Sequence, residues 1–250
     1  MRKTSYGELE QTRMSQEEQE RESYERYMVI VAHPDDMEFS AGGTVAKLAR
    51  EGKHVTLVQV TSGNKGTDRM DITSEELGAM REAELRESCQ RLGVAHIEFF
   101  QIGDGEVMPD LALKERIVRQ LRIHRPDVVI THDPFRPYAL HSDHRGVGQS
   151  TVDAVYPTAR DPLHYHHHLT EEGLQPHKTA ELWLTNPEAP DLYIDITDTV
   201  DAKIHALKAH RSQVGDGEHL EERIKERTAE RGAEAGMEYA EAFKVIKMRR

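Results

Sequence analysis

The chain has 250 residues and a mass of 28.5 kDa, a length that suits one large α/β domain or two small ones. Its 33 Lys and Arg residues against 45 Asp and Glu residues give a net charge of −12, which argues against nucleic acid as a partner. The single cysteine, Cys89, excludes an internal disulfide and a cysteine-based zinc site. Fifteen histidines are typical of metal chemistry, of a histidine-rich loop, or of both.

The first 26 residues are polar and dense in charge, which predicts a frayed helix or a disordered arm. They contain no apolar segment of the kind that a signal peptide has. No stretch of the chain approaches the ~20 apolar residues that a membrane-spanning helix needs. We therefore expect a cytoplasmic protein without membrane insertion, with an arm at 1–26 and a single domain at 27–250.

The domain begins with a short apolar run at 28–32, which is typical of a buried parallel strand. The strand ends at the motif His33-Pro34-Asp35-Asp36, in a loop expected over 33–43. A helix over 44–50 is predicted next because its apolar residues have helical spacing. The β-branched run 54–61 predicts a second strand.

A capping box marks the next helix, since Thr73 and Glu76 stand three residues apart. The helix runs to about Leu92, and Gly93 ends it. The remaining elements that the pattern predicts are a strand at 94–100, a helix at 111–124, a strand at 127–131, a helix at 147–156, short strands at 181–185 and 192–196, and charged helices at 198–213 and 219–231; 239–246 is ambiguous.

The alternation of strands and helices predicts an α/β fold, Rossmann-like, with a mostly parallel sheet and helices on both faces. Ligands of such sheets bind at the carboxyl ends of the strands, where the strand order reverses. This rule directs attention to two loops, 33–43 after the first strand and 132–144 after the fourth.

Both of these loops carry groups that bind metals. The first holds His33-Pro34-Asp35-Asp36 and the second holds His141-Ser142-Asp143-His144. A catalytic zinc site needs three N or O ligands, which His33, Asp36 and His144 offer, and Asp35 is then left as a base. The alternative is a strand-end turn at the first motif and, at the second, a surface loop whose Asp143 only caps a helix.

These motifs resemble those of the LmbE-like or PIG-L-type N-deacetylases. The resemblance extends through nearly all of 28–246. It rests on the ordered pair of metal motifs and on Gly42-Gly43-Thr44, Arg81-Glu82-Ala83, Leu92-Gly93, Thr131-His132-Asp133-Pro134 and Ala209-His210-Arg211-Ser212-Gln213.

The resemblance implies a zinc-dependent hydrolase that removes an acyl group, usually acetyl, from an amino sugar or its conjugate. It implies that His33, Asp36 and His144 bind the metal and that Asp35 is the general base. Fe²⁺, Co²⁺ or Mn²⁺ would bind the same donors.

The resemblance implies further roles around this metal. His141 stabilises the oxyanion or protonates the leaving amine, and Asp143 hydrogen-bonds and tunes that histidine. Arg81 and Asp104 lie where the family contacts the sugar. Members of the family are often oligomeric, so a homo-oligomer, a trimer or hexamer, is implied as well.

The leading hypothesis is therefore an N-deacetylase acting on a small molecule, an N-acetylglucosamine-type sugar or its conjugate. A second hypothesis keeps the metal and changes the reaction to hydrolysis of another acyl-amine or of a phosphoester. A third is a sugar- or nucleotide-binding Rossmann-like module without catalysis. The absence of a G-x-G-x-x-G motif after the first strand argues against that module.

Two further features receive structural interpretations. The tract His164-Tyr165-His166-His167-His168 has no carboxylate arranged around it in the sequence, and we expect a solvated loop in preference to a second metal site. Cys89 lies within a predicted helix and is expected to be a buried structural thiol.

Overall fold

The computed structural model describes residue 17 and residues 19–248. Most of the predicted arm, 1–16 and 18, lies outside the described residues. The end of the arm packs on the domain, because Tyr24 is part of the buried core and Arg21 Nε forms an ion pair of 2.9 Å with Glu181 Oε2.

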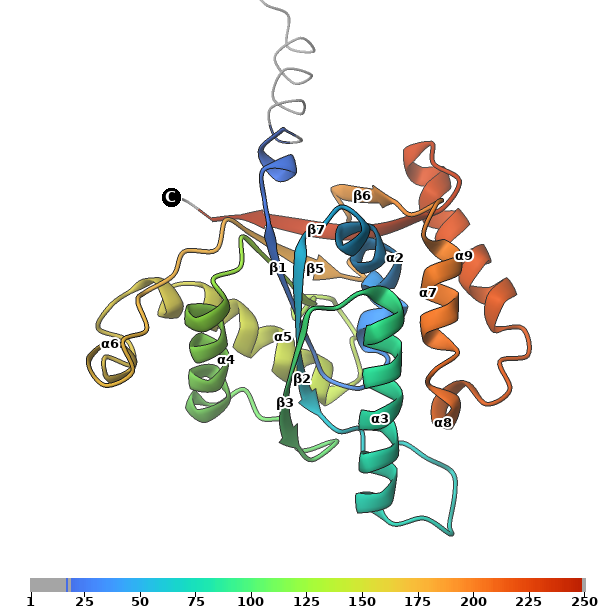
Figure 1. Ribbon diagram of the computed structural model, residues 1–250, viewed down its shortest axis with the longest axis horizontal. Coiled ribbons are helices and arrows are strands. Elements are labelled where there is room, and N and C mark those ends of the chain that lie inside the picture. The colour runs from blue at the N-terminus through green and yellow to red at the C-terminus, as the bar shows by residue number, and fades with distance from the viewer. Residues whose placement is uncertain (1–16, 18, 249–250) are drawn as a thin grey trace, which may run out of the picture.

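A single sheet organises the described residues, with the strand order β3-β2-β1-β4-β5-β7-β6 (Figure 1). The strands are β1 Arg26–Val31, β2 His54–Thr61, β3 His96–Ile102, β4 Val128–His132, β5 Glu181–Thr185, β6 Leu192–Asp195 and β7 Ala240–Lys247. Strands β1 to β5 pair in parallel, whereas β7 runs antiparallel to both β5 and β6. The predicted parallel sheet is confirmed, and the ambiguous segment 239–246 is its antiparallel strand β7.

Helices cover both faces of the sheet, as predicted. They are α2 Asp36–Arg50, α3 Ser74–Leu92, α4 Leu111–His124, α5 Ser142–Val155, the 3₁₀ turn η1 Thr158–Arg160, α6 His167–Thr170, α7 Val200–Leu207, α8 Arg211–Val214 and α9 Leu220–Ala235. Helices α2, α3 and α7 pack together on one side, and α4 and α5 on the other. In the described ranges, none of the helices combines the length and the apolar character needed to cross a bilayer.

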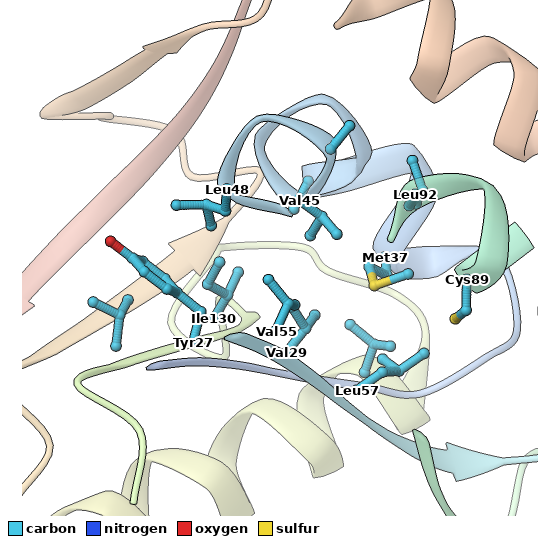
Figure 2. Close-up of a cluster of buried hydrophobic side chains, with 14 of the residues drawn as sticks. Tyr27, Val29, Met37, Val45, Leu48, Val55, Leu57, Cys89, Leu92 and Ile130 are labelled. Atoms are coloured by element: carbon cyan, nitrogen blue, oxygen red, sulfur yellow. The ribbon is translucent and has the colours of Figure 1, made fainter. Parts of the chain in front are cut away.

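The two faces have separate cores because successive residues of β1 point to opposite sides. Val29 lies in the core beneath α2 and α3, together with Met37 and Cys89, as Figure 2 shows. Ile30 lies in the other core, beneath α4 and α5. Cys89 is therefore the buried thiol that its position in the sequence predicts.

Two helices begin earlier than predicted. Helix α2 begins at Asp36 and not at 44, so Gly42 and Gly43 lie inside it rather than in a loop. They are required there by close packing, since a Cβ on Gly43 would lie 2.7 Å from Cδ1 of Ile196. Helix α5 begins at Ser142 and not at 147, with His141 as its N-cap.

A buried ion pair joins α2, α7 and β7. Nζ of Lys203 lies 2.6 Å from Oε1 of Glu241, and both side chains are at most 3% exposed. The same ammonium donates to the carbonyl of Phe39, while the Glu241 carboxylate accepts from the backbone N–H groups of Gly43 and Thr44. The pair therefore satisfies backbone groups in the middle of α2.

The histidine-rich tract differs from its prediction as a solvated loop. His167 and His168 begin the short helix α6, and His168 is fully buried. A carboxylate from a distant part of the chain, Glu115 on α4, lies beside both of them. No local pattern of residues indicates this approach, because 52 residues separate Glu115 from His167.

Candidate metal centre

The two predicted loops meet at the point where the strand order reverses. β1 and β4 are parallel neighbours, with Met28 opposite Val129, although β2 and β3 lie between them in the sequence. The chain leaves β1 toward one edge of the sheet and leaves β4 toward the other. The carboxyl ends of β1 and β4 therefore place the first turn of α2 beside the first turn of α5.

The three predicted metal ligands converge there. Nδ1 of His33 lies 3.1 Å from Nε2 of His144 and 3.3 Å from Oδ2 of Asp36, and His144 Nε2 lies 3.2 Å from Asp36 Oδ1. Tetrahedral ligands about 2.0–2.1 Å from zinc are about 3.3 Å apart, so these separations fit a bound divalent ion. The chemistry of the donors, two imidazoles and one carboxylate, fits as well.

His33 is held by carboxylates on its other nitrogen. Its Nε2 lies 3.1 Å from Oδ2 of Asp143 and 3.3 Å from Oδ1 of Asp104. A carboxylate behind a ligating histidine fixes the tautomer and turns the free nitrogen toward the metal. Asp143 has no exposed surface, and its Oδ2 also accepts from the N–H of Gly105 at 2.7 Å.

This contact differs from the expected partnership of Asp143 with His141. The carboxylate of Asp143 bonds His33, and only the backbone N–H of Asp143 donates to Nδ1 of His141, at 3.3 Å. Because Asp143 lies in the first turn of α5, its side chain points back under the loop that holds His33.

The carboxylates make the site attractive to positive charge. Burial lowers the pKa of His33, but hydrogen bonds with Asp104 and Asp36 outweigh it and raise that pKa to about 10. Burial likewise opposes ionisation of Asp36, but the histidines around it, His132 first, hold its pKa well below the usual range. A cluster that attracts a proton so strongly will also attract a divalent cation.

Asp35 stands beside this cluster in a left-handed conformation, with φ of 115°. Burial and the neighbouring charge of Asp36 raise its pKa to about 7, against the opposing effect of Arg81. A carboxyl group with a pKa near neutrality suits a general base.

Arg81 connects the loop of Pro34 and Asp35 to Gly63 through hydrogen bonds. Its Nη2 donates to the carbonyl of Pro34 at 2.7 Å and lies 3.3 Å from Oδ2 of Asp35, and its Nη1 donates to the carbonyl of Gly63. The guanidinium is buried, so the described contacts are with the protein itself. The sugar contact of Arg81 stays a prediction.

His132 also belongs to the cluster, although the sequence indicated it only as part of the motif Thr131-His132-Asp133-Pro134. Its Nε2 lies 3.4 Å from Oδ2 of Asp36, and its ring stacks on His144 with centroids 4.1 Å apart. The N–H of Ala32 donates to the same Nε2. Its place as the last residue of β4, beside the end of β1, is the pattern that could have identified it.

His141 lies on the exposed side of the cluster. Its ring centroid is 4.4 Å from that of His33 and 4.7 Å from that of His144. Burial and the two neighbouring histidines lower the pKa of His141. An exposed imidazole beside the ligands can contact a molecule that enters from solvent.

Comparison of the sequence with known proteins identifies the family of this chain. The family model described as "PIG-L: GlcNAc-PI de-N-acetylase" matches residues 28–155. Diacetylchitobiose deacetylase of Thermococcus kodakarensis is 31% identical, over 75% of this chain and 70% of that protein. A 1D-myo-inositol 2-acetamido-2-deoxy-alpha-D-glucopyranoside deacetylase of Actinosynnema mirum is 28% identical, over 76% and 81%.

A solved structure of a deacetylase has the same fold as this chain. The N,N'-diacetylchitobiose deacetylase of Pyrococcus horikoshii, in complex with its inhibitor MPG, superposes with a TM-score of 0.87 at 28% identity, covering 99% of this chain and 95% of that one. The resemblance that the two histidine motifs predict is thus confirmed over both sequence and fold. The chain belongs to the PIG-L family of N-deacetylases, hydrolases that act on an amide bond.

Proposed function

We propose that the protein is a zinc-dependent hydrolase that removes the N-acetyl group from an N-acetylglucosamine-type sugar or its conjugate. The observation that carries the proposal is the convergence of His33, Asp36 and His144 within 3.3 Å of one another, beside the spare carboxylate of Asp35. The names of the relatives support the substrate class, since they include a diacetylchitobiose deacetylase and an N-acetyl-alpha-D-glucosaminyl L-malate deacetylase.

In this proposal His33, Asp36 and His144 hold the metal ion. When bound, the ion supplies Lewis acidity for the amide carbonyl and for the attacking water. Zinc suits two imidazoles and a carboxylate with an open position, and Fe²⁺, Co²⁺ or Mn²⁺ would accept the same ligands.

The protein's own groups move the protons. Asp35 takes a proton from water as the water oxygen attacks the carbonyl carbon, and Arg81 holds the Asp35 carboxylate in place. His141, on the exposed side, donates a hydrogen bond to the oxyanion or a proton to the amine as the C–N bond breaks. Acetate and the free amino sugar are the products.

Asp143 and Asp104 both contact Nε2 of His33, and we assign them different roles. Asp143 is a positioning residue, because its carboxylate fixes His33. Asp104 borders the cluster through its contact with His33, and we assign it a contact with the sugar hydroxyl groups. The same contact with the sugar is proposed for Arg81.

Acetate release tests this function. Purified protein is expected to release acetate from N-acetylglucosamine, diacetylchitobiose or an N-acetylglucosaminyl glycoside, to lose the activity with a chelator and to regain it with zinc. N-propionyl and N-benzoyl amines serve as comparison substrates for a different acyl-amine specificity. Fully metallated protein that binds these sugars but releases no acetate would support a binding module and contradict the proposal.

Asp143→Asn is expected to weaken metal binding by about 10–100-fold, because the negative charge that orients His33 is removed. Competition with a chromophoric chelator measures the affinity. Asp153→Asn, on the same helix α5 but hydrogen-bonded to Gln149, is the matched control and should bind like the wild type. Equal affinity in Asp143→Asn and the control would show that the contact with His33 does not serve the metal.

The resemblance also supports a homo-oligomer, a trimer or hexamer, working in the cytoplasm. Sedimentation velocity on the purified chain checks the assembly, and a monomer at micromolar concentration would contradict it. The substrate in this proposal is a small molecule and not a nucleic acid, which agrees with the net charge of −12.

A further inference from the structure

A second group of metal-binding side chains lies on other elements. Nε2 of His167 is 2.9 Å from Oε1 of Glu115, and Nε2 of His168 is 3.4 Å from the same oxygen. The three ligand atoms all lie within 4.8 Å of one another. They come from α4 and α6, so this group shares no residue with the cluster at β1 and β4. Figure 1 shows α4 and α6 on the opposite side of the sheet from α7 and α9.

The segment that carries the two histidines is fixed to α4 by a second side chain. Arg122, on the same helix as Glu115, donates to backbone carbonyls along the segment, those of Thr158, Ala159, Asp161, His164 and Tyr165. The ring of Tyr165 stacks on His168 with centroids 5.6 Å apart, and its hydroxyl donates to the carbonyl of Leu111. The imidazoles therefore face Glu115 on a frame that the rest of the protein already holds.

The group is partly open to solvent. The His168 side chain has no exposed surface, whereas His167 is 42% and Glu115 32% exposed. An ion can therefore enter from solvent and keep a water on its open side, with His168 as its inner ligand. Two imidazoles and one carboxylate with an open position are a zinc-type ligand set.

A positively charged side chain already contacts the carboxylate of this group, since Nη2 of Arg119 lies 3.3 Å from Glu115 Oε1. Arg119 has a second partner, since its Nη1 contacts both carboxylate oxygens of Glu172 at 2.5 Å. Glu172 can therefore retain Arg119 when an ion takes Glu115, so the binding of a metal leaves Arg119 with a partner.

We propose that Glu115, His167 and His168 form a second site for a divalent transition ion of the Zn²⁺, Co²⁺, Ni²⁺ and Cu²⁺ class. An ion bound there links α6 and the segment around it to α4. The proposal does not rest on the deacetylase function, and its residues are separate from those of the catalytic cluster.

Metal stoichiometry tests the proposal, on full-length protein without an affinity tag. Equilibrium dialysis against Zn²⁺ is expected to give two ions per wild-type chain and one per chain in Glu115→Gln and in His167→Asn. The matched controls are His164→Asn and His166→Asn, which alter the same tract outside the group and should retain two. Acetate release by Glu115→Gln, assayed at 25 °C, should stay within about twofold of the wild type.

Thermal unfolding gives a second readout, in the background of Asp36→Asn, which weakens the first site. Zn²⁺ should raise the Tm of this variant, and the rise should become smaller when Glu115→Gln is added. Two results would overturn the proposal: a second ion that remains in Glu115→Gln, or a loss as large in His166→Asn as in His167→Asn. The second would mean that the histidine tract binds metal without the arrangement around Glu115.

Discussion

Asp35→Asn is expected to lower the turnover number by about 10²–10⁴-fold and to leave the metal content of the protein unchanged. Asparagine has the size of aspartate and can keep the contact with Arg81, but it cannot take a proton from water. The loss should therefore fall on kcat, and the KM of the substrate should change little. Steady-state acetate release and elemental analysis of the same preparation measure the two quantities.

The control for this variant is Glu51→Gln, which removes a carboxylate just beyond the other end of α2. It should show wild-type turnover and metal content. If Asp35→Asn kept wild-type turnover, Asp35 would not be the base. If the variant lost its metal, Asp35 would be a ligand and the proposed division of labour between Asp35 and Asp36 would be wrong.

Glu241→Gln is expected to lower the free energy of unfolding by about 3–5 kcal/mol, because it leaves the buried ammonium of Lys203 without a counter-charge. The contacts of the carboxylate with the N–H groups of Gly43 and Thr44 are weakened at the same time. Urea denaturation followed by circular dichroism measures the change.

An exposed ion pair provides the comparison. Glu221 and Lys225 lie on α9 with their charged atoms 2.9 Å apart, and Glu221→Gln should lower the free energy of unfolding far less, because solvent screens the pair. The double variant Lys203→Met/Glu241→Gln should be more stable than Glu241→Gln alone, since it removes the stranded charge. Similar losses in Glu241→Gln and Glu221→Gln would contradict a special role of burial.

Elements governed by local patterns could be predicted from the sequence, and those governed by distant contacts could not. The capping box of Thr73 and Glu76 is present with both of its hydrogen bonds, and α4 has its predicted bounds. The predicted start of α2, at residue 44, was wrong because Gly42 and Gly43 are typical of loops. Their place inside a helix depends on Ile196, which approaches from a remote part of the chain.

The contacts of the functional groups likewise divide into those that the order of the elements predicts and those that depend on distant parts of the chain. The meeting of His33 with His144 follows from the strand-end rule, which needs only the order of the elements. The bond between Asp143 and His33 depends on where α5 begins, and the approach of Glu115 to His167 depends on a loop with no repeating pattern. No short stretch of sequence predicts either of these two contacts.

The pairing of β1 with β4 has a consequence for the time at which the proposed metal cluster forms. His33 and His144 are 111 residues apart, which a ribosome spans in about 6–20 s. During that interval His33 and Asp36 are the only members of the proposed ligand set His33, Asp36 and His144 on the growing chain. Because the pairing of these two strands also closes a long loop, we expect it to form late in folding. In the proposed function, metal loading is therefore tied to the completion of the fold, and a nascent chain holds no finished cluster to compete for a divalent ion.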